Sequence, residues 1–117
     1  MEKREDKLTD LSMQLSVDVL NLVKVLQEKK ERIISNQIGR SATSICANIA
    51  ESKYAHSRAD FIAKLQISLK ECSESEYWLE LLIESGYHGD KAILDRCVEI
   101  KRILISSINT AKENTQK

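Results

Sequence analysis

Proline is absent from the 117-residue sequence, glycine occurs only three times, and aromatic residues make up 4% of the chain. Proline removes a backbone donor and glycine loosens the backbone, so both destabilise the interior of a helix. No alternation of apolar and polar residues indicates β-strands. The composition therefore predicts long helices, in a chain whose length is typical of one domain.

An excess of either charge is also missing, because 18 Lys and Arg residues balance 18 Asp and Glu residues. This balance argues against a dedicated nucleic-acid-binding domain, whose usual mark is a strong basic excess, although it leaves room for a local basic patch. The first residues, MEKREDKLTD, are too charged for a secretory signal. The longest apolar-rich run, residues 100–108, is interrupted and much shorter than a membrane span. We therefore expect a cytoplasmic protein that does not enter a membrane.

The three cysteines, Cys46, Cys72 and Cys97, are widely spaced, and each is set in an apolar helical pattern. Disulfide frameworks use an even number of cysteines, and zinc sites use closely spaced Cys or His pairs. Neither pattern occurs here. We expect the three side chains to be reduced and buried, as is usual in cytoplasmic proteins.

Apolar residues recur every three or four positions, which predicts helices over residues 6–28, 31–53, 58–86 and 90–112. Helices of this length with short connections pack most simply as an up-down-up-down bundle. The predicted fold is therefore all-α, an antiparallel four-helix bundle formed by a single domain over residues 1–117. The residues of the apolar stripes are Leu8, Leu11, Leu15, Val19, Leu22, Leu26, Ile34, Ile38, Ala42, Ile45, Ile49, Phe61, Leu65, Leu69, Cys72, Leu79, Ile83, Ile93, Cys97, Ile100, Leu104 and Ile108.

Start and stop signals lie between these segments. The charged run EKKER, residues 28–32, is predicted to be a solvated turn. Ser57 is followed by Asp60 in a pattern similar to a capping box, in which the serine oxygen accepts from the Asp60 amide. Gly86 can adopt the left-handed conformation that ends a helix. The last residues, KENTQK, are expected to fray.

The second segment carries a polar stripe beside its apolar one. Its members follow at spacings of three, four and three, and they are Ser41, Ser44, Asn48 and Glu51. The same segment is rich in Gly, Ala and Ser, whose small side chains let a neighbouring helix approach closely. We expect bulky residues of the third segment to fill this space, namely Tyr77, Trp78, Leu81 and Leu82.

Three interpretations of the polar stripe are open. Glu71 and Glu74 lead into Trp78 on the third segment, so the stripe could join these carboxylates or backbone groups in a buried, fully hydrogen-bonded network. The same residues could instead form a seam between subunits. They could also hold a ligand or an ion.

Arrangements typical of catalysis or metal binding are missing. Carboxylate-bridged metal bundles use Glu-x-x-His motifs, but none occurs, and His56 and His88 fall near predicted helix ends. The serines lack a nearby base, and no glycine-rich phosphate loop follows a strand. We therefore predict that the protein is not an enzyme and has no catalytic, cofactor-binding or metal-ligating residues. No small-molecule substrate is indicated.

The chain resembles the bacterial four-helix-bundle proteins called 23S rRNA intervening-sequence proteins, also labelled S23 ribosomal proteins. The resemblance covers residues 37–87, in the stretches IGRSATSICANIAES and HSRADFIAKLQISLKECSESEYWLELLIESGY. It implies an antiparallel bundle, ring-like homopentamers and a genetic association with sequences inserted in rRNA genes, without an established enzymatic activity. Related accessory proteins of diversity-generating retroelements share the bundle and bind a reverse transcriptase and RNA through basic surfaces.

The resemblance assigns structural or subunit-interface roles to Arg40, Ser41, Ser44, Asn48, Glu51, Asp60, Phe61, Glu71, Glu74, Tyr77 and Trp78. Gly39 stands where many relatives have a second basic residue, which weakens any basic stripe here. Residues 57–86 carry three basic and six acidic side chains, whereas residues 87–117 carry six basic and four acidic ones. These opposite charges favour complementarity between subunits over phosphate binding.

The leading hypothesis is a non-enzymatic cytoplasmic assembly protein that forms a homo-oligomer, with a pentamer as the expected size. The alternative is an accessory subunit that binds RNA, or an RNA-binding protein such as a reverse transcriptase. The basic residues available for that role are Lys29, Lys30, Arg32, Arg40, Lys101 and Arg102. A third hypothesis is a carboxylate-bound metal protein.

Overall fold

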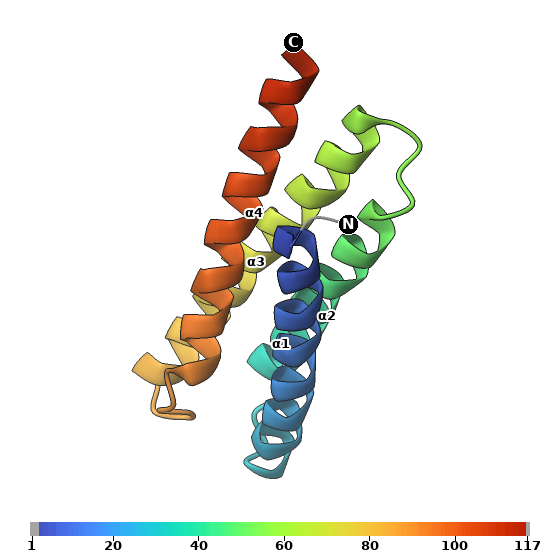
Figure 1. The fold of residues 1–117 in the computed structure, drawn as a ribbon. Helices are drawn as coiled ribbons and strands as arrows, with labels where there is room; N and C mark the ends of the chain where they lie inside the picture. Colours follow the sequence, from blue (N-terminus) through green and yellow to red (C-terminus); the bar gives the residue numbers. More distant parts are fainter. Residues whose placement is uncertain (1–2, 117) are drawn as a thin grey trace.

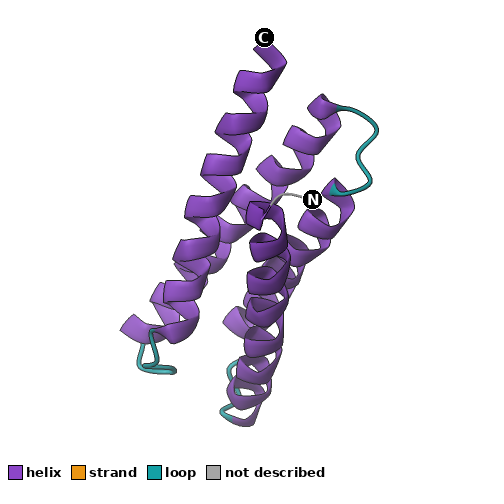
Figure 2. Ribbon diagram, in the orientation of Figure 1, coloured by secondary structure: helices purple, strands orange, loops and turns teal. Residues whose placement is uncertain are grey.

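The computed structural model describes residues 3–116, which form four helices joined by short connections. The helices are α1 (Lys3–Glu28), α2 (Ile33–Ser52), α3 (Arg58–Glu84) and α4 (Ala92–Gln116). The α1–α2 and α3–α4 connections lie at one end of the molecule and the α2–α3 loop lies at the other (Figure 1). Only these connections are non-helical within the described residues (Figure 2). The predicted all-α, up-down-up-down bundle is confirmed.

Each helix packs against two neighbours, so the four form a closed ring around one core. The contact between α2 and α3 is the most extensive, and the contact between α1 and α4 is the least. Within residues 3–116 the backbones of the diagonal pairs, α1 with α3 and α2 with α4, do not approach each other. The molecule measures 51 × 21 × 20 Å, so its long sides are helix surfaces.

The predicted apolar stripes form the core. Their members are buried except for four that are half-buried, namely Leu11, Phe61, Leu69 and Ile83. Burying a Leu or Ile side chain stabilises a fold by about 1.5–3 kcal/mol, so these stripes supply the main favourable term. Cys72 and Cys97 are buried as predicted, but Cys46 is only half-buried because it lies at the edge of the α2 stripe.

The charged run 28–32 contains the turn between α1 and α2, as predicted, and it is exposed except at Glu31. Lys30 has a φ of 63°, in the left-handed region, and this bend brings the next residue back over the start of α2. Glu31 is buried, and its carboxylate accepts the backbone N–H groups of Ile33, Ile34 and Ser35 at 3.2, 2.8 and 2.9 Å. The first N–H groups of a helix have no partner within the helix. Glu31 therefore supplies the cap that α2 requires.

The other predicted helix signals are confirmed. The Ser57 hydroxyl accepts from the Asp60 amide at 3.1 Å, and the Asp60 carboxylate accepts from the His56 amide at 3.2 Å. Gly86 has a φ of 81°, and its N–H donates to the Ile83 carbonyl at 3.1 Å. The left-handed glycine thus ends α3 where the sequence placed a stop.

Several helix ends lie a few residues from the predicted positions. α2 begins at Ile33 rather than residue 31 because Glu31 caps it, and α3 ends at Glu84 because Gly86 reverses the chain. The tail that was expected to fray continues α4 to Gln116. No proline or glycine follows residue 89, so nothing in the sequence forces this helix to stop.

Replacing Glu31 with alanine should lower the free energy of unfolding by about 1–2 kcal/mol, because three backbone donors lose their cap. Urea unfolding of both proteins at one protein concentration measures the change. Glu28→Ala is the matched control, since Glu28 is exposed in the last turn of α1. Equal unfolding free energies for the two variants would contradict the capping role.

Candidate functional site

The residues identified by the family resemblance all lie on α2 and α3. Most of them lie along the outer edge of the contact between these two helices, and we call this surface the α2–α3 face. It comprises Arg40, Ser44, Asn48 and Glu51 of α2 with Lys64, Glu71, Glu74, Tyr77 and Trp78 of α3. The polar stripe of α2 therefore lies beside the motif residues of α3 on one surface of the molecule.

Small buried side chains line the contact beneath this face. The hydroxyls of Ser41 and Ser75 lie 2.8 Å apart and share a hydrogen bond between α2 and α3. The Ser68 hydroxyl donates to the Ile45 carbonyl of α2 at 3.1 Å. All three serines are buried. A side chain that reaches the backbone of the next helix through a single hydroxyl requires a close approach of the two helices.

The predicted pairing of small α2 residues with bulky α3 residues is wrong at this contact. Both helices contribute serines to this contact, and Tyr77 is 57% exposed rather than packed inside. Of the other bulky residues, Leu82 is buried and Trp78 packs partly against the core. Ser68 and Ser75 were not identified from the sequence. They share the period of the apolar α3 stripe, and that spacing was the available signal.

Arg40 bridges the two helices at the surface. One guanidinium nitrogen lies 3.0 Å from both carboxylate oxygens of Glu74, and the other lies 3.4 Å from Glu71. The Glu71 side chain is only 13% exposed. The predicted network joined these carboxylates to the α2 serines, but a guanidinium offers them opposite charge as well as several donors. The carboxylates therefore pair with Arg40 instead.

The remaining members of the α2 polar stripe bond locally or at the surface. The Asn48 amide donates to the Ser44 carbonyl at 2.9 Å and lies 3.2 Å from the Ser44 hydroxyl, within its own helix. Glu51 is exposed and pairs with Lys64 of α3 at 3.3 Å. The prediction of a buried network is therefore wrong for Glu51, which is exposed, whereas Asn48 is half-buried and bonds to a backbone group. Only Ser41 is buried and bonded across the helix contact.

The aromatic and capping residues have separate roles. Asp60 belongs to the α3 cap, and Phe61 packs against the core. Tyr77 and Trp78 form an edge-to-face pair with ring centroids 5.0 Å apart. The Trp78 indole N–H is buried and has no hydrogen-bond partner among the described residues. These two rings give the α2–α3 face an apolar end beside its charged centre.

The six basic residues proposed for RNA binding belong to three parts of the chain, namely the α1–α2 turn, α2 and α4. The Lys29 amine donates to the Tyr87 carbonyl at 2.8 Å, and Arg40 is held by α3 carboxylates. Lys101 lies between α3 and α4, 2.7 Å from Glu76, and this hydrogen bond raises the pKa of the Lys101 amine. Lys30, Arg32 and Arg102 are exposed. Half of the predicted set is therefore already bonded within the chain.

One surface hollow lies apart from this face, and another adjoins its Glu51–Lys64 end. A groove of about 340 Å³ runs between α1 and α4 beside the Asp18–Arg96 ion pair, and a polar hollow of similar size adjoins His56 in the α2–α3 loop. No three His, Cys, Asp or Glu side chains among residues 7–114, whose side chains the structure describes, are placed to hold a metal ion. Within residues 3–116, every helix is too short or too polar to cross a membrane.

The geometry of the α2–α3 face fits a contact surface. It offers paired charges, an exposed aromatic ring and helix backbones fixed by buried hydroxyls. The serines that the sequence singled out bond to another serine, to a backbone carbonyl or to an amide, and none contacts a histidine or carboxylate that could act as a base.

Removing the Arg40 guanidinium should cost about 1 kcal/mol of unfolding free energy, because Glu71 is left largely buried without its cation. Adding Glu71→Gln to Arg40→Ala should recover part of this loss, since a neutral amide needs no counter-charge. Chemical denaturation of both variants, with the exposed Arg102→Ala as the control, tests the pairing. A loss in Arg40→Ala no larger than in the control would contradict it.

Comparison with known proteins agrees with the fold and the motif. The chain matches the family described as "23S rRNA-intervening sequence protein" over residues 4–106. Searching the curated proteins gave no match. A solved structure of a protein with unknown function from the S23 ribosomal protein family of Bacteroides thetaiotaomicron VPI-5482 is 46% identical, with a TM-score of 0.87. The similarity covers 91% of this chain and 98% of that one. The chain belongs to the 23S rRNA-intervening sequence protein family.

Proposed function

We propose that the protein is a non-enzymatic cytoplasmic assembly protein whose copies form a homo-oligomer. The pentameric ring implied by the family resemblance is the expected form. Two strips of exposed apolar side chains on opposite helices carry this proposal.

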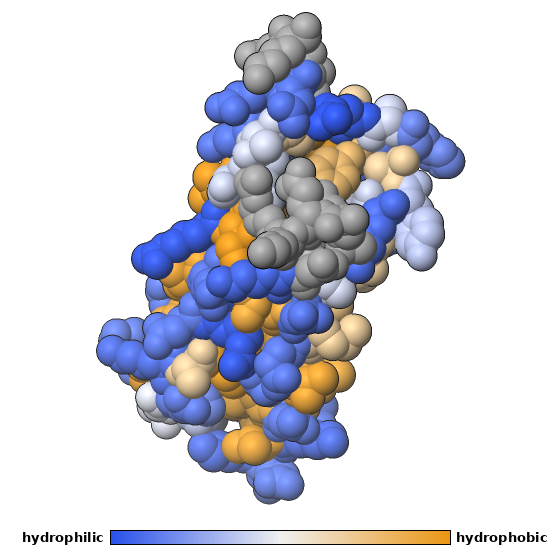
Figure 3. All heavy atoms as spheres, in the orientation of Figure 1, coloured by the Kyte–Doolittle hydropathy of each residue, from blue (hydrophilic) through white to orange (hydrophobic). Residues whose placement is uncertain are grey.

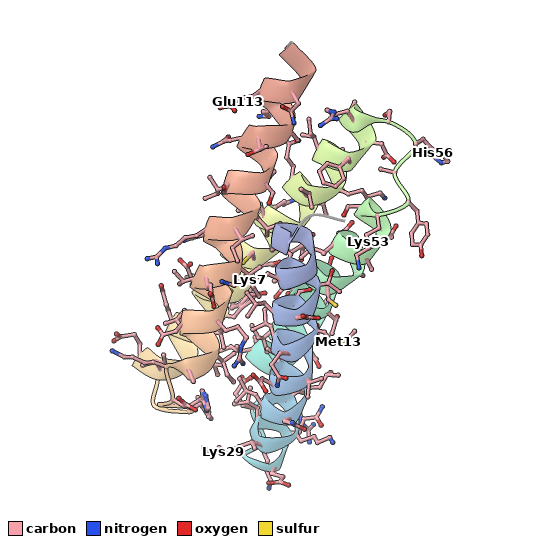
Figure 4. All side chains as sticks on the ribbon, viewed as in Figure 1. Lys7, Met13, Lys29, Lys53, His56 and Glu113 are labelled. Carbon is pink, nitrogen blue, oxygen red and sulfur yellow. The ribbon has the colours of Figure 1, made fainter. Side chains whose placement is uncertain are left out.

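The first strip lies on α1. Met13, Val17 and Leu20 are 56%, 45% and 50% exposed, and their spacing of four and three places them on one face of the helix. Figure 4 labels Met13 on α1, and Figure 3 shows apolar side chains among the charged ones on the side where α1 lies in front. The core residues Leu15 and Val19 of the same helix are fully buried. Contiguous exposed apolar residues mark interaction sites on folded monomers.

The second strip lies on α3, at the edge of the α2–α3 face. Ile67 is 43% exposed and Tyr77 is 57% exposed, while Leu81 is half-buried one turn beyond Tyr77. Because α1 and α3 are diagonal in the bundle, the two strips lie on different sides of the molecule. Contacts between two different surfaces of identical subunits repeat from copy to copy, and they form a ring when the rotation closes.

Charge contributes less to this assembly than the segment charges suggested. Glu71 and Glu74 share Arg40, and Glu76 pairs with Lys101, so half of the six acidic side chains in residues 57–86 already have a cationic partner within the chain. An interface made of the two apolar strips should therefore persist at high salt. Binding to nucleic acid through phosphate contacts weakens steeply with salt.

The observations favour self-assembly over the RNA-binding alternative. Lys29, Arg40 and Lys101 bond within the chain and lie on different parts of the bundle. A groove for a phosphate backbone would need a continuous row of available cations. The two apolar strips need no such row.

Size-exclusion chromatography with light scattering should show a complex of several chains for the purified, nuclease-treated protein. The double variant Val17→Glu/Leu20→Glu should be a single chain, because burying two new carboxylates in the interface is unfavourable. Its circular dichroism spectrum should remain helical, since both positions are exposed in the single chain. Val25→Glu is the matched control, since Val25 is 42% exposed on α1 but outside the strip. A single-chain wild type, or an assembly lost after nuclease treatment or in high salt, would contradict the proposal.

A mixing experiment tests whether the two strips contact each other. The α1 double variant and Tyr77→Glu each keep one intact strip. When mixed, they should form a complex of one chain of each, whereas neither assembles alone. Failure of the mixture to associate, with both variants folded, would mean that α1 and α3 are not partners across the interface.

A further inference from the structure

Two buried thiols from different helices lie side by side. The Sγ atoms of Cys72 on α3 and Cys97 on α4 are 3.6 Å apart, and neither residue is exposed to solvent. Each thiol also reaches the other residue's backbone carbonyl, at 3.2 Å from Cys72 and 3.4 Å from Cys97. These reciprocal contacts show that the two helix backbones approach closely where the cysteines face each other.

We propose that Cys72 and Cys97 are an oxidation site, at which hydrogen peroxide joins α3 to α4 through an intramolecular disulfide. A disulfide requires a sulfur–sulfur distance of roughly 2.05 Å and closely spaced backbones. The sulfurs, now 3.6 Å apart, must close the gap by about 1.5 Å, which small rotations of two short side chains can supply. Cys46 lies on α2, whose backbone does not approach that of α4 within the described residues, so it cannot replace Cys72 as the partner of Cys97.

The reaction balances with peroxide as the only oxidant. One sulfur attacks a peroxide oxygen, the O–O bond breaks, and a sulfenic acid and one water form. The second sulfur then attacks the sulfenic sulfur, and the oxygen leaves as a second water after taking the remaining thiol proton. Two thiols are oxidised to one disulfide, and one peroxide is reduced to two waters.

The surroundings make this oxidation slow. The hydrogen bond that the Cys97 thiol shares with Cys72 and the burial of this thiol both raise its pKa, and the nearby Glu76 carboxylate acts in the same direction. Lys101, one turn along α4, opposes them. Peroxide reacts with thiolate, so little reactive sulfur is present until α3 and α4 separate locally. The pair should remain reduced under brief exposure and become oxidised on sustained exposure.

The disulfide would fix the position of α4. The contact of α4 with α3 is more extensive than its contact with α1, so α3 is its principal neighbour in the bundle. A bond between residues 72 and 97 closes the loop that contains the α3–α4 connection. Closing such a loop restricts the unfolded chain more than the folded one.

Prolonged incubation of the Cys46→Ser variant with hydrogen peroxide, followed by alkylation, tests this proposal. Intact mass should show the loss of two hydrogens without alkylation at either thiol, and non-reducing peptide mapping should join the peptides of Cys72 and Cys97. The thermal midpoint should rise by about 10 °C and return after reduction. All readouts other than the midpoint are made under denaturing conditions, so they do not depend on the oligomeric state.

Cys46→Ser/Cys97→Ser is the matched control and should gain neither the cross-link nor the shift in midpoint. Should this variant fail to fold, the peptide map of Cys46→Ser alone still decides the question. Full alkylation of both thiols after exposure, over-oxidation without a cross-link, or a disulfide only between chains would each overturn the proposal.

Discussion

The close contact between α2 and α3 is the constraint on which the rest of the structure depends. Ser41, Ser68 and Ser75 replace larger core side chains there, and their hydroxyls bond across the contact rather than to water. Buried hydroxyls without partners are costly, so these bonds are satisfied only in one register of the two helices. The same register sets Arg40 opposite Glu71 and Glu74 at the surface.

Fixing this register has consequences on both sides of the contact. Outward, it presents Tyr77 and Ile67 beside the charge cluster of Arg40, Glu71 and Glu74. Inward, it orients α3 so that Cys72 meets Cys97 of α4. One helix thus contributes the proposed subunit surface from its outer side and the proposed oxidation site from its inner side.

The fold could be predicted because its causes are local in sequence. Apolar periodicity, the absence of proline, the Ser57 cap and the Gly86 stop each act within a few residues, and together they gave four helices in the correct order. Glu31 was misread because a charged residue in a charged run gives no sign that three backbone amides surround it. The start of α2 differed from prediction for the same reason, since the Glu31 cap defines it.

The candidate site was predicted in location but not in bonding. Arg40 meets Glu71 and Glu74 from 31 and 34 residues away, and Cys72 meets Cys97 from 25 residues away. Helical period shows which side of a helix a residue occupies, but the pairing depends on how far one helix is shifted along the next. Ser75 fits the apolar period of α3, and a serine in that position gives no indication of its partner until the register is known.

A double-mutant cycle on Ser41 and Ser75 tests this constraint most directly. Each single change to alanine leaves one buried hydroxyl without its partner and should lower the free energy of unfolding by about 1–2 kcal/mol. The double variant removes both hydroxyls together, so its loss should be clearly smaller than the sum of the two single losses. Strictly additive losses would show that the two hydroxyls do not interact, and the account of the α2–α3 contact would then be wrong.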